Sequence, residues 1–272
     1  MSALSKYLHE IFRDAKKYGD KASKDFDEDD IHEMRVAVKK IKAAFHFLQF
    51  CDPDLKDDEL KKLKKIFSEA GELRELQLLT GAIQKFRGLK NKDDKESLLD
   101  FLKDEEKKSK KKFHRQFQKS GKEILDDLKK VMLKKRNISS EDEVRYFQNM
   151  LQTIVEKMRR NDLTTEEYHE VRKKLKELKY NLIFASEQSK QIVALTFSED
   201  ELSQLEESLG TWHDQVIIIS RLKEIAVKKT NLQALISEAV IRTQRRSNLL
   251  LKKISNQFQK KAAAIQLDVK SS

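Results

Sequence analysis

The sequence predicts an all-α protein in which an internal duplication produces two small antiparallel helical bundles. Helix breakers are rare, because the 272 residues include only one proline and six glycines. Apolar residues make up 38% of the chain and recur at helical spacing. A pattern of basic residues also occurs twice, about half a chain length apart, which indicates the duplication.

The first half is predicted to open with a helix over residues 3–18, followed by a second helix over 31–50. An acidic run precedes the second helix, and Asp29 or Asp30 is expected to cap it. That helix should end just before Pro53, because the residue that precedes a proline disfavours helical geometry.

Further helices of the first half are expected over residues 55–70, 72–87, 95–119 and a short stretch that ends near 135. Gly71, between the first two of these, allows a bend or a close helix contact. A loop is expected over 88–94, and a break near Ser120 and Gly121.

The segment 137–140 has the composition of a linker, so the expected domains are residues 1–136 and 141–272. The helices expected in the second half cover residues 141–160, 169–187, a pair within 198–228 around Gly210, and 231–263. Thr164 followed by Glu167 predicts a capping box at the start of the second of these helices.

The 31–50 helix carries a stripe of basic-capable side chains along one face. His32, Arg35, Lys39 and Lys42 follow one another at helical steps, which places them within an arc of about 80°. Apolar residues lie on roughly the opposite side, so the helix is amphipathic. One such stripe is ordinarily a solvated helix face, and by itself it does not indicate a site.

The same spacing returns in the second half as His169, Arg172, Lys176 and Lys179. A solvated face needs only polarity and tolerates Glu, Gln or Ser at any of these positions. Matched His, Arg and Lys positions in two separate helices therefore predict a shared anion-binding face. His46 projects within the first stripe and is a further candidate.

A second pair of matched segments, 71–75 and 210–214, supports the duplication. Both read as Gly, two residues, a basic-capable residue and then an acid, with a slightly larger offset that indicates one small insertion. Each acid is expected to lie near a His or Arg of a stripe and orient it, with an ordinary surface salt bridge as the alternative. The residues concerned are Arg74 with Glu75, and His213 with Asp214.

The overall charge favours a polyanionic partner. The formal net charge is +11 and the pI is about 9.4, which suits nucleic acid, polyphosphate or an anionic membrane surface. Cys51 is the only cysteine, so no internal disulfide can form, as expected in a reducing cytosol. No apolar run is long enough for a signal peptide or a membrane span.

The two His-x-x-Arg-x-x-x-Lys-x-x-Lys stripes and the two Gly-x-x-[Arg/His]-[Glu/Asp] segments resemble the motifs of CHAD domains, the conserved-histidine α-helical domains. The resemblance covers residues 3–263. It implies two four-helix bundles related by a pseudo-two-fold axis, with a basic cavity between them. It also implies binding of inorganic polyphosphate, often at polyphosphate granules.

The second motif departs from the usual family pattern, which is Arg-Asp followed by Asp-Val. Glu75 replaces the acid in the first copy, and His213 replaces the arginine in the second. Neither copy is followed by Asp-Val. The network around this motif is therefore expected to differ from that of the family, whereas the basic stripes are unaffected.

Lysine supplies point charges for phosphate, and arginine supplies a bidentate fork. The residues expected to bind polyphosphate are His32, Arg35, Lys39, Lys42, Arg74, Lys108, His169, Arg172, Lys176, Lys179, His213, Arg245 and Arg246, with Glu75 and Asp214 as supporting acids. Lys108, Arg245 and Arg246 come from long basic helices on which the halves do not align, so a solvated face is their alternative.

We expect no enzymatic activity, no metal and no cofactor. The sequence has no Gly-rich phosphate loop, and His32-Glu33 is not followed by the second histidine of a zinc motif. The alternatives are a nucleic-acid-binding helical protein, disfavoured because the basic helices lack interleaved aromatic residues, and a scaffold that recruits partners to granules. The expected location is the cytoplasm, in association with polyphosphate granules.

Overall fold

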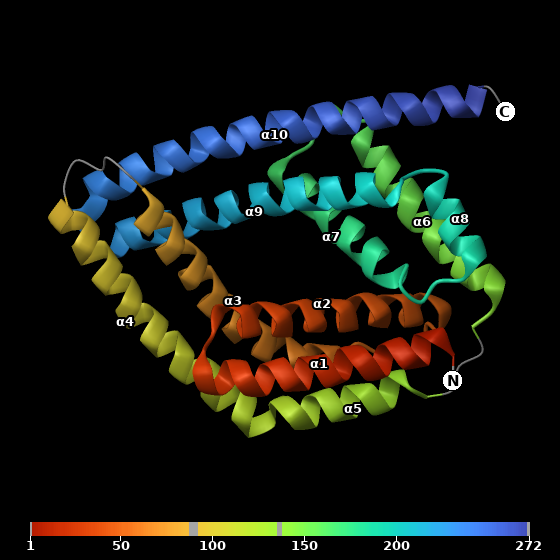
Figure 1. The fold of residues 1–272 in the computed structure, drawn as a ribbon, viewed down its shortest axis with the longest axis horizontal. Coiled ribbons are helices and arrows are strands. Elements are labelled where there is room, and N and C mark those ends of the chain that lie inside the picture. The colour runs from red at the N-terminus through yellow and green to blue at the C-terminus, as the bar shows by residue number, and fades with distance from the viewer. Residues whose placement is uncertain (1, 87–91, 135–137, 271–272) are drawn as a thin grey trace.

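The computed structural model describes residues 2–86, 92–134 and 138–270, and these ranges are helical, with no strand among them (Figure 1). The prediction of an all-α protein is confirmed. The helices of the first half are α1 (Ala3–Asp25), α2 (Glu28–Cys51), α3 (Asp58–Lys85), α4 (Lys92–Gln116) and α5 (Lys122–Met132), with a π turn at Phe117–Gly121.

The start of α2 differs from the prediction, whereas its end does not. Asp27 is the cap, and its carboxylate accepts hydrogen bonds from the backbone N–H groups of Asp29 and Asp30. The predicted cap at Asp29 or Asp30 is wrong because both acids already lie in the first helical turn, where they face the positive end of the helix dipole. The helix ends at Cys51, as the following proline requires.

The other boundaries of the first half are partly as predicted. Helix α3 runs through Gly71 without a break, so the two predicted helices are one. Of the predicted loop over 88–94, residues 88–91 lie outside the described residues, whereas Lys92–Asp94 are helical. The predicted break at Ser120 and Gly121 takes the form of the π turn between α4 and α5.

The second half contains α6 (Ser140–Met158), α7 (Thr165–Asn181), α8 (Glu187–Ala194), α9 (Glu199–Lys228) and α10 (Gln233–Lys270), with a 3₁₀ turn at Thr230–Leu232 before α10. The capping box of Thr164 and Glu167 is confirmed. The helix that follows it ends at Asn181 rather than at 187, and Ser186 then caps α8, a helix that was not predicted.

The predicted helix pair within 198–228 is also wrong. Helix α9 is continuous through Gly210, because buried Leu209 and Trp212 anchor the helix on either side of the glycine. Of the predicted linker 137–140, Asn137 lies outside the described residues. Ser139 caps α6, and Ser140 is already helical.

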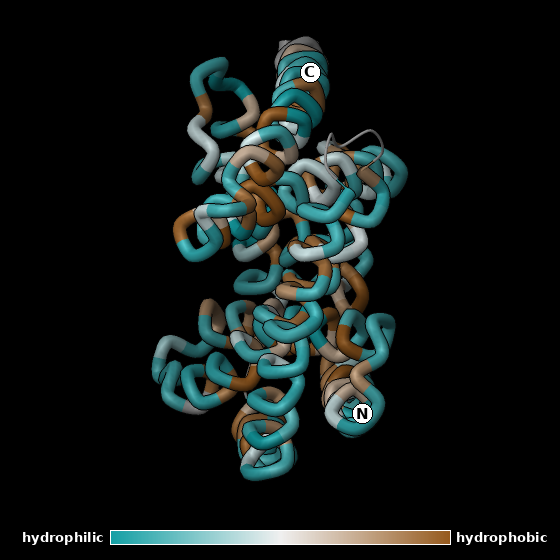
Figure 2. Tube along the Cα trace, turned by 90° about the vertical axis from the view of Figure 1, so that its left-hand side faces the viewer, coloured by the Kyte–Doolittle hydropathy of each residue, from teal (hydrophilic) through white to brown (hydrophobic). Residues whose placement is uncertain are grey.

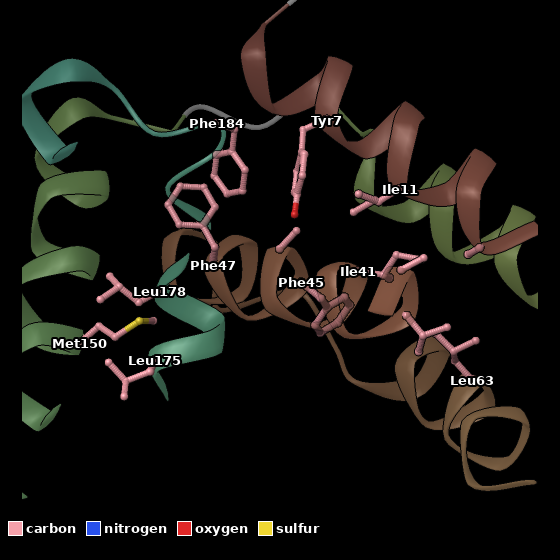
Figure 3. Packing of buried hydrophobic residues seen from close by; sticks show 14 of the residues in the cluster. Tyr7, Ile11, Ile41, Phe45, Phe47, Leu63, Met150, Leu175, Leu178 and Phe184 are labelled. Atoms are coloured by element: carbon pink, nitrogen blue, oxygen red, sulfur yellow. The ribbon is translucent and has the colours of Figure 1, made fainter. Parts of the chain in front are cut away.

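The main hydrophobic core runs from one half of the chain into the other. Tyr7 of α1 and Phe47 of α2 pack on Phe184, with ring centroids 5.3 and 5.1 Å from its own. Figure 3 shows α2 in the middle of this core, with Ile11 and Leu63 on one side and the α6 and α7 residues on the other. Since this core is shared, the division into domains 1–136 and 141–272 and the internal duplication both stay predictions.

A second, smaller apolar cluster lies at the other end of α3. There the C-terminal part of α3 and the start of α4 pack against the C-terminal part of α9 and the start of α10, through residues that include Ile83, Leu98, Leu222 and Ile236. In Figure 1, α1, α2 and α5 lie in the lower part of the molecule and α9 and α10 in the upper part, while α3 and α4 run between the two. Figure 2, seen from the side, has the N-terminus in the lower part and the C-terminus at the top. The two clusters hold α3 against α9 and α2 against α7, so that these four helices face one another.

Candidate functional site

A cavity of about 660 Å³ lies between the two halves of the chain. Its walls come from α2 and α3 of the first half and from α7 and α9 of the second, and these helices pack α2 on α7 and α3 on α9. Residues of both basic stripes line the cavity. The amphipathic pattern explains this placement, because the apolar sides of α2 and α7 are buried in the shared core.

Arg35 of α2 is held against α3. Its Nη1 donates a hydrogen bond to the carbonyl of Phe67 at 3.1 Å, and its guanidinium lies 4.5 Å from the centroid of the Phe67 ring. Burial lowers the pKa of Arg35 to about 10, despite the nearby Glu75 carboxylate. Arg35 therefore remains charged at neutral pH, in a fixed orientation, with donors left for a ligand.

Lys39 lies one turn further along α2 among other cations. Burial, followed by the charges of Arg35, Lys176 and Arg172, lowers its pKa from 10.5 to about 7. No described residue forms an ion pair with it within 4 Å. The ammonium group thus sits in an environment that would favour an added negative charge.

Arg172 and His169 carry polar atoms with no protein partner. Arg172 Nε and His169 Nδ1 are buried and find no hydrogen-bonding group among the described residues. Such groups are costly to bury, so they indicate a site prepared for a ligand that accepts hydrogen bonds. Burial lowers the pKa of Arg172, although Asp214 and Glu206 oppose that shift.

Two histidines from the two second-half motifs lie side by side in the cavity. The ring centroids of His169 and His213 are 4.5 Å apart. Burial and nearby cations, Lys173 for the first and Arg172 for the second, lower their pKa values to about 4 and about 3. Both imidazoles are therefore neutral at neutral pH, as is favoured between so many cations.

Carboxylates are distributed unevenly around the cavity. Glu206 of α9 contacts Lys176 at 2.5 Å and Lys179 at 2.9 Å, one lysine on each oxygen. Glu75 accepts a hydrogen bond from Arg221 at 2.8 Å, so it contacts α9 rather than a stripe residue. Burial raises the pKa of Asp214, and no described residue donates a hydrogen bond to its side chain. Among the described residues, neither acid forms the predicted hydrogen bond to a stripe residue. Glu75 acts on Arg35, and Asp214 on Arg172, only through its charge.

A buried polar network joins the halves beside the cavity. Asn181 Nδ2 donates to the Ala43 carbonyl at 3.0 Å and lies 2.7 Å from the Tyr146 hydroxyl. Tyr146 in turn donates to Glu177 at 2.9 Å, and His46 Nδ1 lies 3.4 Å from the same carboxylate. These contacts fix α2 against α6 and α7, and so fix the distance between the two stripes.

Most of the sequence-predicted residues meet in this cavity. Those that line it are His32, Arg35, Lys39, Lys42, Arg74, Glu75, His169, Arg172, Lys176, His213 and Asp214, together with His46. Arg74 also donates a hydrogen bond to Glu28 at 3.2 Å.

Four predicted residues do not line the cavity. Lys179 is held outside by Glu206 and Ser203, and Lys108 lies exposed on α4, paired with Glu105 at 2.7 Å. Arg245 and Arg246 line a separate, smaller hollow of about 390 Å³ at the C-terminal end of α3, beside Lys85 and Phe86. The long basic helices on which the halves do not align therefore contribute nothing to the cavity wall.

Several lining residues were not predicted, among them Lys173, Tyr180, Glu206 and Phe67. Lys173 and Tyr180 stand four and eleven positions after His169, so the helical spacing that marked the stripe could have found them. Glu206 and Phe67 belong to other helices, and no repeat marks them in the sequence.

The arrangement brings Arg35, Lys39 and Arg172 together in one cavity, and none of these three cations forms an ion pair within 4 Å with a described residue. Such a cavity can bind a multiply charged anion through charge-assisted hydrogen bonds, and Arg35 and Arg172 can each present a planar fork of donors. Within the described ranges, no group of three His, Cys, Asp or Glu side chains is placed to hold a metal ion. Among the same residues, no helix is both long enough and apolar enough to cross a bilayer.

Comparisons with known proteins identify the fold and family. The sequence profile of the CHAD domain matches residues 6–223, somewhat less than the 3–263 expected from the motifs. The fold is similar to that in the crystal structure of the CHAD domain from the plant Ricinus communis, with a TM-score of 0.76 over 94% of this chain and 92% of that chain. The two sequences are 16% identical, so this likeness concerns the fold alone. No curated protein matches the sequence.

Proposed function

The chain belongs to the CHAD-domain family, and from that premise we propose that it binds inorganic polyphosphate in the cavity between its two halves. One observation carries the proposal. Arg35, Lys39 and Arg172, from two distant parts of the sequence, converge on one cavity, and none of them has a carboxylate partner within 4 Å among the described residues.

The energetics of these cations favour an anionic ligand. The pKa values of Arg35, Lys39 and Arg172 are all lowered by burial, which means that their charged forms are less stable here than in water. A bound anion would reverse that cost. Its binding would therefore gain free energy both from direct contacts and from relief of the repulsion among the cations.

The shape of the site favours a flexible chain of phosphates over a duplex nucleic acid. The cations are recessed between four helices, where a flexible chain of phosphates can follow them more closely than the backbone of a rigid duplex. A single strand would need aromatic faces on which to stack its bases. Phe67 and Tyr180 both line the cavity, but the Phe67 ring is already contacted by Arg35 at 4.5 Å and lies 5.7 Å from Lys42. Tyr180 alone does not provide a series of faces for successive bases.

Competition binding tests this proposal. Trp212 is the only tryptophan, it is buried, and its ring centroid lies 6.4 Å from that of His213, so its fluorescence should report on ligand binding in the cavity. We expect long-chain polyphosphate to bind more tightly than duplex DNA of equal charge in the same salt. Equal or tighter DNA binding would favour the nucleic-acid alternative.

We propose binding without catalysis. Polyphosphate incubated with the protein should keep its chain length and release no orthophosphate, which gel analysis and a phosphate assay would follow. Appearance of shortened chains would instead indicate an enzyme.

The cellular counterpart of the proposal is recruitment to polyphosphate granules. A fluorescently tagged chain should gather at granules in cells that make polyphosphate and spread evenly in cells that cannot. The Arg35 and Arg172 alanine variant should spread evenly in both. A cavity variant that still gathers at granules would favour the scaffold alternative.

A further inference from the structure

Glu206 lies at the cavity wall, where its carboxylate contacts two lysines. Its Oε1 is 2.5 Å from Lys176 and its Oε2 is 2.9 Å from Lys179, so each carboxylate oxygen receives one ammonium group. Two non-bridging oxygens of a phosphate group can bind two lysines in the same way. Both Lys176 and Glu206 line the cavity, and their side chains are 18% and 21% exposed, so this contact is partly shielded from solvent.

The contact involves the same lysine that the cavity needs. Lys176 is one of the charges that act on Lys39, so its ammonium group faces the cluster of uncompensated cations as well as Glu206. Burial would raise the pKa of Glu206, but hydrogen bonds from Lys176 and Lys179 lower it below its ordinary value. Glu206 is therefore ionised at neutral pH, and it competes with any polyanion for Lys176.

Resting on the proposed function, we propose that Glu206 is a built-in competitor of polyphosphate that sets how tightly the cavity binds its ligand. A chain that occupies the Arg35, Lys39 and Arg172 cluster takes Lys176 from Glu206, while Lys179 keeps the carboxylate. Binding then includes the cost of breaking one partly buried ion pair. The carboxylate also repels phosphates at that end of the cavity, so anions of low charge gain too little there to displace it.

The chain offers a matched control for this proposal. Glu207 neighbours Glu206 on α9 and also lines the cavity, but its side chain is exposed and no ion pair joins it to a described residue. Glu206→Gln and Glu207→Gln remove the same charge from the same wall. Only the first removes the contact with Lys176, and glutamine keeps the shape and hydrogen-bonding capacity of the side chain.

The experiment measures the affinity of the wild type, E206Q and E207Q for long-chain polyphosphate by isothermal titration calorimetry at several salt concentrations. We expect E206Q to bind about threefold tighter or more than both other proteins, which is the scale of one ion pair. Its affinity should also fall more steeply with salt, because in the wild type salt weakens the Glu206–Lys176 ion pair that binding must break, which offsets part of the loss. Thermal unfolding of each protein establishes that all three are folded.

The outcomes separate this proposal from the one it rests on. If E206Q binds no tighter than E207Q, or binds more weakly than the wild type, Glu206 is a positioning residue for Lys176 and the competitor role is wrong. That result would leave the proposed function intact, because the wild type still binds. If the wild type itself does not bind polyphosphate, the proposed function fails first.

Discussion

The chemistry of Lys39 depends on the cations that surround it. An isolated lysine has a pKa of 10.5, whereas burial and the charges of Arg35, Lys176 and Arg172 bring this one to about 7. The ligand-free protein is therefore a mixture of charged and neutral Lys39 near neutral pH. A bound polyanion stabilises the charged form, so Lys39 takes up a proton from solution when the polyanion binds.

The first prediction concerns the pH dependence of binding. Because Lys39 must be protonated to contribute its charge, affinity for polyphosphate should fall as the pH rises from about 6 through 7 to about 8. Calorimetry at pH 7.5 in buffers with different ionisation enthalpies should show net proton uptake. Lys39→Met should abolish most of that uptake, and unchanged uptake in this variant would place the titrating group elsewhere.

The second prediction concerns stability without ligand. Since the folded pKa of Lys39 lies below the unfolded one, the unfolded chain binds more protons between pH 7 and 10.5, and the stability of the wild type should rise with pH across that window. Lys39→Met removes the penalty. It should raise the free energy of unfolding at pH 6–7 by on the order of 1 kcal/mol or more, an advantage that shrinks toward pH 10.5.

Chemical denaturation of Lys39→Met beside Lys107→Met, an exposed residue of α4, checks this second prediction. The exposed variant should match the wild type. If Lys39→Met is no more stable than Lys107→Met, the Lys39 side chain is well solvated in the free protein.

Helix α3 approaches α2 closely at one point, and this contact fixes Arg35. A Cβ placed on Gly71 would lie 2.7 Å from Arg35 Nη1, closer than side-chain atoms ordinarily come. At the matched position of the second half, a Cβ on Gly210 would meet nothing within 4 Å. The close helix contact that the sequence allowed at Gly71 is therefore present, whereas the matched glycine of the second half, Gly210, makes no such contact.

The third prediction uses this difference. Gly71→Ala should move the Arg35 guanidinium off the Phe67 carbonyl and weaken polyphosphate binding, by up to about tenfold if one charge-assisted contact is lost. Gly210→Ala should bind like the wild type. Both variants should stay folded, because the preference of helices for alanine over glycine, about 1 kcal/mol, offsets the hydrogen bond that Arg35 loses in Gly71→Ala. Equal affinities in the two variants would show that Arg35 adapts without cost.

The fourth prediction concerns the network that joins α2 to α6 and α7. Asn181 is buried and donates hydrogen bonds to the Ala43 carbonyl and the Tyr146 hydroxyl. Asn181→Ala removes the donor that these two groups share. The free energy of unfolding should fall by about 1–3 kcal/mol. Asn149→Ala on the exposed side of α6 should have little effect. A similar small effect in both variants would mean that water replaces the lost contacts.

At the scale of the whole molecule, the sequence could predict the helical class and the two stripes because both are periodic. His32, Arg35 and Lys39 share a helix face whatever the helix packs against, and their repeat around His169 is visible in the letters. The same logic located the capping box at Thr164, whose partners lie three residues apart.

The remaining features depend on contacts between distant segments. Nothing local marks Glu206 as the partner of Lys176, or Arg221 as the partner of Glu75, because these contacts exist only once α9 packs on α7 and α3. Gly210 looked like a helix break because glycine disfavours helix, but the packing of Leu209 and Trp212 overrides that preference. Lys108 and Arg245 looked like ligands because basic charge alone does not tell which face of a helix meets the cavity.

One comparison tests most directly whether the recessed cations, rather than the general positive charge, bind polyphosphate. The double variant Arg35→Ala/Arg172→Ala and the double variant Lys107→Ala/Lys111→Ala each remove two positive charges, the first pair from the cavity and the second from the exposed side of α4. Their affinities for long-chain polyphosphate are measured in the same salt, with near-ultraviolet circular dichroism of Trp212 to show that both are folded. The cavity variant should lose tenfold or more in affinity, since each charge-assisted contact contributes about 1.5–3 kcal/mol, while the α4 variant stays within about twofold of the wild type. Equal losses in the two folded variants would contradict a specific site in the cavity.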